Sequence, residues 1–256
     1  MERLNENQET RGFSAAVLQT WGYLFLLLGI AAALIQNRML GLSGMTGQQV
    51  LDLMNQSGAT MSLVTASLIL QALESCAVPI FALLTVESFA KTTNWKRQIG
   101  SIALVALVSE IPYNLAMSGQ VLDFSTRNPA FGLVIALVML WFYRYYDEKG
   151  GNATLMKVVL TAAAVLWCGM LSIHHGTFLV LMVAVLWLIR NKPYKILIGA
   201  LAAAFGCLIS IYYVVSPISF LAVHFYNGEE GQQNKIFSMI CYPLLLLAGF
   251  AAAILI

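Results

Sequence analysis

The sequence predicts an all-α protein of the membrane: one bundle of about eight transmembrane helices, with a further short helix that re-enters the bilayer or lies at its interface. Two observations support this fold class. The 256 residues are 59% hydrophobic and only 10% charged, with a mean hydropathy of +0.78, whereas a water-soluble domain has about 25% charged residues. The apolar residues also gather in runs of about 20 residues, the length that crosses a bilayer as a helix. The net charge of +2 is too small to indicate a nucleic-acid partner.

Each apolar run predicts one spanning helix, and the short polar stretches between the runs predict loops. We expect spans at residues 14–36, 61–89, 99–117, 129–146, 155–173, 176–189, 196–215 and 237–256. The polar residues 1–13 predict a cytoplasmic N-terminal segment, and residues 14–256 predict a single transmembrane domain.

Two stretches depart from this simple pattern. The second run is long for one crossing, so we expect a tilted or kinked helix that is broken near Glu74 and Ser75. Residues 216–226 are too few to cross the bilayer and predict a re-entrant or interfacial half-helix. Such a segment is tolerated only where protein or water covers its loose backbone.

The basic residues predict the orientation. If the N-terminus is cytoplasmic, all of the 14 Lys and Arg residues except Arg38, Arg127 and Lys235 lie on the cytoplasmic side. Such an excess on cytoplasmic loops is the general rule for membrane proteins. We therefore expect a multi-pass protein of the cell membrane with both termini in the cytoplasm. The four cysteines lie within apolar runs, where thiols pack like small hydrophobic groups.

The stretch SEIPYN places a carboxylate inside an apolar run. Glu110 and Asn114 are four residues apart, on one helical face, and Pro112 between them frees a backbone carbonyl. A charged side chain at the bilayer centre costs about 3 kcal/mol on insertion scales, so Glu110 requires a partner. The candidates on the same side are Arg127 and the adjacent histidines, His174 and His175. Glu110 then either borders a ligand cavity or locks helices together near the interface.

The histidines fill a tight turn between the fifth and sixth predicted spans. An imidazole titrates near pH 6.5 and can move protons, so His174 and His175 are candidate catalytic bases, together with Glu110. Adjacent histidines in a short turn are also simple interface residues. We expect no metal, since no third ligand has helical spacing to the pair. The polar residues expected to bind substrate are Gln36, Asn37, Glu74, Tyr113, Asn114, Arg127, Asn128 and Asn227.

Five segments in one order carry a family resemblance. CAVPIFALLTVESF with KTTN, SEIPYNLA, NPAFGLVIAL, HHGTFLVLMVAVLWLIRNK, and FYNGEEG with a later CYPLLLL resemble the TraX family from about residue 20 to the end. That family is named for a conjugation protein that acetylates the N-terminus of pilin. The resemblance implies a membrane acyltransferase fold in a bacterial inner membrane, with acyl-CoA or acetyl-CoA as the donor. The matching positions are Pro79, Phe81, Glu87, Thr92, Pro112, Tyr113, Asn128, Phe131, Gly176, Asn227, Gly228, Tyr242 and Pro243.

The chain also departs from the family pattern. Gln36 and Asn37 stand in place of Asp-His, Glu74 and Ser75 in place of Gly-Arg, and Leu245 in place of a His. If the family's Asp-His pair is its general base, this protein either recruits another base or has lost acyl transfer. His174 and His175 are the available substitutes.

Two classes of function follow. In the first, the protein is an acetyltransferase-like enzyme: a polar pocket binds an amine or hydroxyl of a peptide or glycan, a histidine takes its proton, and Glu110 orients the histidine or the acceptor. Asn114, Asn128 or the free backbone near Pro112 would stabilise the oxyanion. In the second, the protein is a non-catalytic ligand-binding membrane protein or a small transporter, for which buried carboxylates and broken helices are typical. Both readings place the chain in a lipid bilayer.

Overall fold

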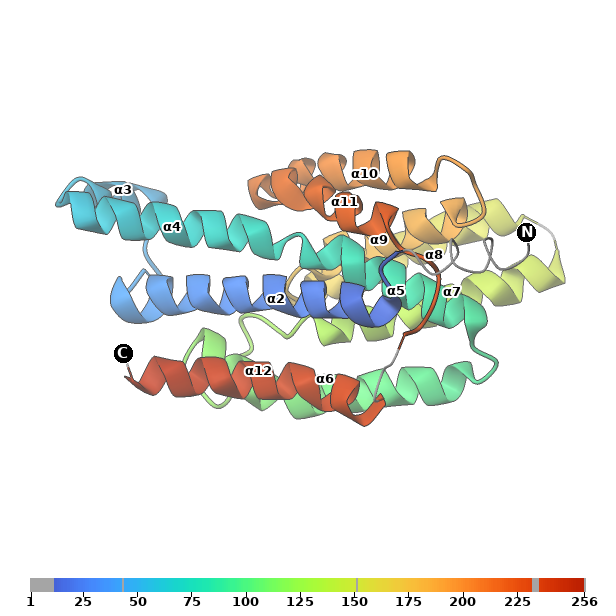
Figure 1. Cartoon of the computed structure of the whole chain (residues 1–256), viewed down its shortest axis with the longest axis horizontal. Helices are drawn as coiled ribbons and strands as arrows, with labels where there is room; N and C mark the ends of the chain where they lie inside the picture. The colour runs from blue at the N-terminus through green and yellow to red at the C-terminus, as the bar shows by residue number, and fades with distance from the viewer. Residues whose placement is uncertain (1–11, 43, 151, 232–234, 256) are drawn as a thin grey trace, which may run out of the picture.

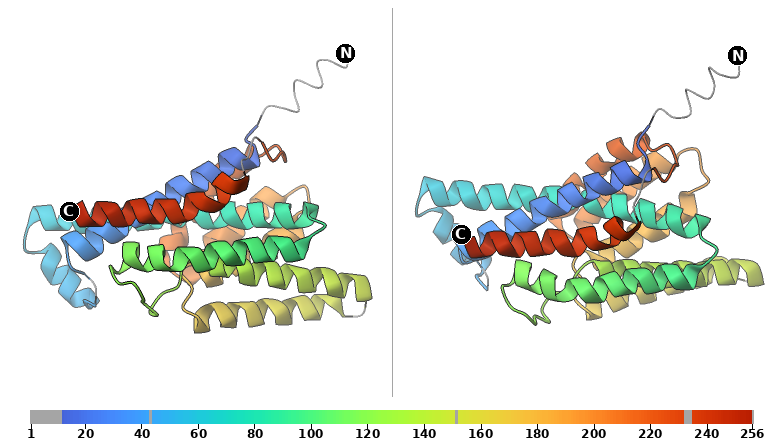
Figure 2. Two further views of the ribbon diagram at one scale, coloured as in Figure 1. Left: turned by 90° about the horizontal axis from the view of Figure 1, so that it is seen from below. Right: turned by 60° about the horizontal axis from the view of Figure 1, so that its bottom comes forward.

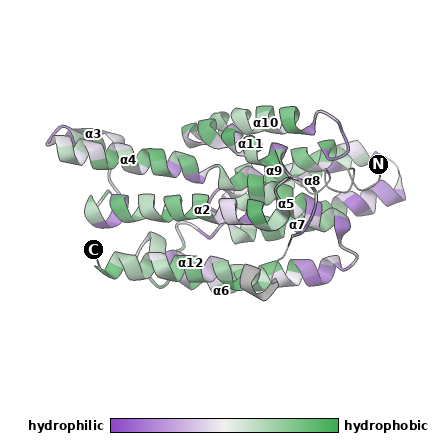
Figure 3. Ribbon diagram, viewed as in Figure 1, coloured by the Kyte–Doolittle hydropathy of each residue, from purple (hydrophilic) through white to green (hydrophobic). Residues whose placement is uncertain are grey.

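The protein is seen here in a computed structural model, which describes residues 12–42, 44–150, 152–231 and 235–255. Within these ranges the chain forms helices and no β-strand, as the sequence predicts. The helices run along the long axis of the molecule, and apolar residues predominate in most of them (Figures 1 and 3). Most of the polar segment predicted at residues 1–13 lies outside the described residues.

The helices follow the predicted runs closely. In chain order they are α2 (Ala15–Leu34), the π-helix η1 (Ile35–Met39), α3 (Gly47–Met54), α4 (Gly58–Glu74), α5 (Ala77–Lys91), α6 (Trp95–Met117), α7 (Ala130–Lys149), α8 (Ala153–Met170), α9 (Gly176–Ile189), α10 (Lys195–Phe205), the 3-10 helices η2 (Gly206–Leu208) and η3 (Ile211–Ile218), α11 (Ser219–His224) and α12 (Lys235–Leu255). Polar caps mark several starts: the Ser14 side chain accepts from the Val17 N–H, and the Asn94 side chain accepts from the Arg97 N–H.

Five helical stretches of the described chain are long and apolar enough to cross a membrane. They are Ala15–Met39, Gly58–Lys91, Trp95–Met117, Ala130–Lys149 and Ala153–Met170. The remaining apolar helices are shorter, so the chain is a multi-pass membrane protein, while the predicted number of eight spans is not confirmed.

The predicted break in the second span is confirmed. α4 ends at Glu74, Ser75 and Cys76 form the turn, and α5 begins at Ala77. Pro79 follows within the first turn of α5, where a backbone N–H has no partner within the helix in any case. The Ser75 hydroxyl donates to the carbonyl of Tyr212 at 3.1 Å. This hydrogen bond therefore connects the break between α4 and α5 to η3.

The span predicted at residues 196–215 differs from the structure. α10 ends at Phe205, the chain turns through η2, and η3 with α11 returns along α10. The half-helix predicted at 216–226 is thus the end of a longer helical hairpin over residues 195–224. The run is apolar throughout, and apolar composition alone does not distinguish one crossing from two short helices that reverse direction.

This hairpin changes where the chain ends. It brings Tyr226 back beside Phe13, and the Ala15 N–H donates to the Glu229 carbonyl at 2.8 Å. α12 therefore starts near the start of α2 and runs in the same direction, so residue 12 and the end of α12 lie at opposite ends of the bundle (Figures 1 and 2). The sequence predicted both termini on one side, because it counted α10 as a full crossing.

One end of the bundle carries most of the positive charge. The loops that join α5 to α6, α7 to α8 and α9 to α10 lie at the same end as residue 12 (Figure 1). We call this the basic end, and it is defined by Lys91, Lys96, Arg97, Lys149, Lys192 and Lys195. That the basic end faces the cytoplasm stays a prediction.

The core has two parts. The larger cluster packs α5, α7 and α9 with the 195–224 hairpin and includes Phe178 and Tyr213. The smaller cluster joins α2, α6 and α12 and includes Ile30, Tyr113 and Tyr242. The break between α4 and α5 lies near the middle of the long axis (Figure 1), where the two clusters meet.

Candidate functional site

Glu74 is a buried carboxylate at the break between α4 and α5. As the last residue of α4 it is only 4% exposed. On α2, Gly29 leaves the space that the carboxylate occupies, since a Cβ atom added there would lie 2.5 Å from Oε1, inside the 3.0 Å that real Cβ contacts keep. Oε1 lies 3.5 Å from Nε2 of His174 and 3.7 Å from Nε2 of His175.

Both histidines stand in the turn between α8 and α9. His175 has a φ of 55° and Ser172 a φ of 51°, a left-handed conformation that residues other than glycine seldom adopt. Backbone hydrogen bonds hold the turn: the His174 N–H donates to the Arg127 carbonyl at 2.9 Å, and the Arg127 N–H donates to the Ser172 carbonyl at 3.0 Å. The ring centroids of His174 and His175 are 3.9 Å apart. This strained turn directs both imidazoles toward Glu74.

The His175 ring is fixed from its other side. Its Nδ1 lies 2.7 Å from the hydroxyl of Tyr213, whose ring stacks on Phe178 with centroids 4.1 Å apart. Its Nε2 is buried and has no hydrogen-bond partner among the described residues.

A narrow cavity of about 10 Å³, which is about the space that one water molecule needs, adjoins this cluster. Glu74 and His174 form part of its wall. The other lining residues come from α2, α6, the start of α7 and α12: Leu26, Ile30, Tyr113, Met117, Pro129, Tyr242, Leu245 and Leu246. The Tyr242 hydroxyl is buried and makes no hydrogen bond within the described chain. The cavity is therefore apolar apart from a carboxylate, an imidazole and two phenols.

Glu110 belongs to a second, neighbouring polar cluster. Of the partners considered from the sequence, the structure pairs it with Arg127, whose Nη1 lies 3.1 Å from Oε1. Asn128 donates to Oε2 from its side chain at 2.6 Å and from its backbone at 3.3 Å, and to the Ala106 carbonyl at 2.9 Å. Because Arg127 also pairs with the histidine turn through its backbone, this cluster holds the turn in place. It is Glu74 that lies against the imidazoles.

Gln36 and Asn37, both expected to bind substrate, join helices instead. The Gln36 side-chain amide donates to Ser67 Oγ at 3.3 Å and to Gln71 Oε1 at 3.2 Å, which ties η1 to α4. The Asn37 amide donates to the Met117 carbonyl at 2.7 Å, which ties η1 to α6. Neither residue lines the cavity beside Glu74.

Of the remaining residues predicted to bind substrate, Tyr113 and Asn114 lie in or near the cavity beside Glu74, and Asn227 lies at the basic end. Tyr113 lines the cavity, while its neighbour Asn114 is buried, donates weakly to the Val121 carbonyl at 3.5 Å and has an Oδ1 without a partner in the described chain. Asn227 lies at the basic end, where its N–H donates to the Phe13 carbonyl at 3.0 Å. The structure thus brings Glu74, Tyr113 and the histidines together and separates Asn227 from them.

Sequence reasoning missed the contact between Glu74 and the histidines. Glu74, His174 and His175 each offer one ligand atom, and these atoms all lie within 4.8 Å of one another. The expectation of no metal considered spacing along a single helix, whereas the third group comes from a helix break a hundred residues earlier. The available signal was a carboxylate at a break inside an apolar run, at a position where the family pattern has glycine.

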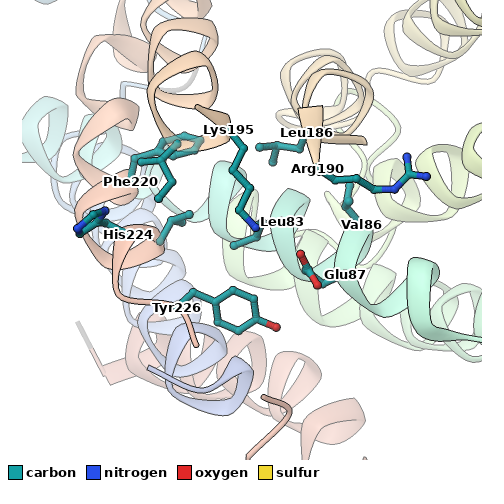
Figure 4. Close-up of a pocket in the computed structure, with 11 residues that line it drawn as sticks. Leu83, Val86, Glu87, Leu186, Arg190, Lys195, Phe220, His224 and Tyr226 are labelled. Atoms are coloured by element: carbon teal, nitrogen blue, oxygen red, sulfur yellow. The ribbon is translucent and has the colours of Figure 1, made fainter. Parts of the chain in front are cut away.

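A second pocket, of about 50 Å³, lies at the basic end. Figure 4 shows Glu87, Arg190 and Lys195 around it, with Tyr226 and His224 on the opposite wall. Burial, and then the charge of Glu87, raise the pKa of Tyr226 to about 12, so its hydroxyl is neutral.

Lys91 stands four residues after Glu87 on α5 but makes no ion pair with it among the described residues, because the Lys91 ammonium donates to the Gly228 carbonyl at 2.6 Å. The Glu87 carboxylate is therefore left to the pocket at the basic end.

Comparison with known proteins gives the family. The sequence profile of the family described as TraX protein matches residues 36–250, which is most of the chain. The match includes the helix break, the histidine turn and the residues that line both pockets, except Leu26 and Ile30 of the cavity beside Glu74. No curated protein and no solved structure matches the chain.

Proposed function

Because the chain belongs to the TraX family, we propose that it is an integral membrane acyltransferase, which moves an acyl group from an acyl-CoA to an amine or hydroxyl of a peptide or glycan. One observation carries the proposal: Glu74, His174 and His175 come together beside a cavity in a largely apolar bundle. Intramembrane ionisable residues mark functional sites by default, because they are costly to keep in lipid.

The cluster suits the proton transfer that acyl transfer requires. His174 is 25% exposed and borders the cavity, so it can accept the proton of an incoming amine or hydroxyl. The carboxylate of Glu74 then offsets the positive charge on the imidazole. The acceptor atom bonds to the thioester carbonyl carbon, the carbon–sulfur bond breaks, and the departing coenzyme A thiolate takes up a proton. The Tyr242 hydroxyl, which has no partner in the described chain and belongs to a residue lining the cavity, would donate to the oxyanion.

The pocket at the basic end suits the donor. Lys195 provides positive charge for the phosphates of an acyl-CoA (Figure 4). The guanidinium of Arg190 points away from the pocket in Figure 4 and donates to the Trp187 carbonyl at 2.8 Å. Glu87 lies 13 residues after Glu74, which is ~20 Å along a helix, so the acyl end and the phosphates would occupy separate sites. If the basic end faces the cytoplasm, as the positive charges predict, this pocket opens on the compartment that holds acyl-CoA.

The departures from the family pattern support a relocated base rather than a lost one. Glu74 and Leu245 both adjoin the cavity that His174 borders. Where the family pattern has a histidine this chain has Leu245, and His174 supplies an imidazole to the same cavity from another element.

The test is acyl transfer by the purified full-length protein in nanodiscs, with labelled acetyl-CoA and a periplasmic extract as the source of acceptors. We expect transfer by the wild type and a loss of about 10²–10⁴-fold in His174→Ala, the usual contribution of a general base. No transfer and no binding of acetyl-CoA by calorimetry would overturn the proposal. Uptake of a solute into liposomes that depends on Glu110 and a pH gradient would favour the transporter instead.

A further inference from the structure

The distances within the Glu74 cluster are unusual for hydrogen bonds. An imidazole N–H that donates to a carboxylate lies about 2.7–2.9 Å from the oxygen. Here two imidazole nitrogens approach the same oxygen, Oε1 of Glu74, at 3.5 and 3.7 Å. Both distances are too long for strong hydrogen bonds. They are short enough for the three atoms to surround one ion.

The separations match one coordination geometry better than another. Zinc bonds of about 2.0–2.1 Å in a tetrahedral site place neighbouring ligand atoms ~3.4 Å apart. An octahedral site with similar bond lengths would place neighbouring ligands only ~3.0 Å apart. The distances of 3.5 and 3.7 Å from Oε1 exceed both values and are nearer to tetrahedral spacing, and all three ligand atoms lie within 4.8 Å of one another.

A buried polar atom without a partner gives an independent reason for a ligand. The His175 side chain is 9% exposed, and its Nε2 has no hydrogen-bond partner within the described residues although it points toward Glu74. Leaving such an atom unsatisfied costs about 1–3 kcal/mol. A metal–nitrogen bond would satisfy it.

The surroundings of His175 are those of a metal ligand. The Tyr213 hydroxyl lies 2.7 Å from Nδ1. In the tautomer that carries its ring proton on Nδ1, His175 donates to Tyr213 and leaves the Nε2 lone pair facing Glu74. Metal-binding histidines almost always hold their second nitrogen in this way. Phe178 stacks on Tyr213 and keeps its ring in place.

From this geometry we infer that Glu74, His174 and His175 bind one zinc-type divalent ion in a tetrahedral site whose fourth position opens to the cavity. Two imidazoles and one carboxylate with an open position form a known catalytic zinc donor set. The inference goes beyond the proposed function and does not depend on it, since binding is measured without a substrate.

Charge indicates what would fill the fourth position. A divalent ion with one carboxylate and two neutral imidazoles leaves a net charge of about +1 in a buried site, which favours an anionic fourth ligand. Glu110 is already paired with Arg127 and cannot supply it. A hydroxide or the deprotonated hydroxyl of an acceptor fits. In the proposed acyl transfer the ion would replace His174 as the group that activates the acceptor, because the Nε2 lone pair of His174 is then bound to the ion. A hydroxyl bound at the fourth position would lose its proton to water more readily, because the ion lowers its pKa.

The experiment measures metal in the purified full-length protein in detergent. The protein is stripped with a chelator, reloaded with ZnCl₂, desalted and analysed by mass spectrometry for metal content. We expect about one zinc per chain, and Co²⁺ in its place should give the intense visible absorption of a tetrahedral site. Wild-type protein that elutes as a folded species without stoichiometric zinc would overturn the inference, as would six-coordinate cobalt.

Variants separate this site from adventitious binding. Glu74→Gln and His175→Ala should lose the zinc, while His224→Ala, which removes the exposed third histidine, should keep it. Tyr213→Phe retains the ring stacked on Phe178 and should weaken zinc affinity by about 10–100-fold. Equal zinc in Glu74→Gln and wild type would refute the site. A chain that binds zinc but transfers no acyl group would overturn the proposed function alone.

Discussion

Gly29→Ala tests the geometry of the site from a residue with no polar side chain of its own. The added Cβ atom would lie 2.1 Å from Cδ of Glu74, 2.3 Å from Oε2 and 2.5 Å from Oε1, whereas an ordinary van der Waals contact is at least 3.4 Å. The carboxylate oxygen must therefore move by roughly 1 Å, since α2 and α4 pack directly on each other. A displacement of that size changes the spacing of Oε1 from both imidazoles.

The expected magnitude separates function from stability. A misplacement of about 1 Å in a catalytic group costs on the order of 10²-fold in rate. The change in the free energy of unfolding is smaller, because overpacking destabilises by about 1–3 kcal/mol while replacing a helical glycine by alanine stabilises the helix by about 1 kcal/mol. We expect Gly29→Ala to lose about 10²-fold in acyl transfer and to bind zinc more weakly, with the free energy of unfolding lowered by no more than about 2 kcal/mol.

The matched control is Gly100→Ala, in α6, where an added Cβ atom meets nothing within 4 Å. It should keep both transfer and zinc affinity and unfold at the same temperature or slightly above. The assays are labelled-acetyl transfer, zinc titration and thermal unfolding in detergent followed by size exclusion. If Gly29→Ala behaves like Gly100→Ala in all three, the close approach of Glu74 to α2 is not a feature of the working protein.

Three further predictions test the surroundings of the site. Glu110→Gln leaves Arg127 without its ion-pair partner and should lower the free energy of unfolding by about 1–3 kcal/mol, measured by thermal unfolding. An unchanged melting temperature would argue against a role of the Glu110–Arg127 pair in holding the histidine turn. Lys195→Met should raise the KM for acyl-CoA with kcat unchanged, since it removes a ground-state contact with the donor, and a fall in kcat alone would contradict this. Ser75→Ala removes the hydroxyl that donates to the Tyr212 carbonyl and should lower the free energy of unfolding by about 1 kcal/mol. An unchanged free energy of unfolding would show that this hydrogen bond does not stabilise the helix break.

The sequence anticipated the features that depend on local chemistry. The break after Glu74 was predictable because a carboxylate and a serine interrupt an apolar run that is too long for one crossing. The pairing of Glu110 with Arg127 was among the options, because the two residues are 17 apart and stand on either side of one loop. In both cases the cost of a charge in lipid restricts the possible partners.

The features that were missed depend on the fold. The contact of Glu74 with His174 joins residues a hundred positions apart, and no spacing rule reaches across helices at that separation. The hairpin at 195–224 was missed because hydropathy reports transfer into lipid and not the point where the backbone reverses. Gln36 was taken as a substrate ligand because it is polar and stands at a span end, yet helix-to-helix hydrogen bonds account for it.

The most direct test of the central claim is the rate of labelled-acetyl transfer by Glu74→Gln, compared with Glu148→Gln, which changes an exposed carboxylate on α7. Both substitutions remove one negative charge and keep the shape of the side chain. If Glu74 and the two histidines form the working site, Glu74→Gln loses at least about 10²-fold in rate and Glu148→Gln keeps the rate of the wild type. Equal rates for the two variants would contradict the account.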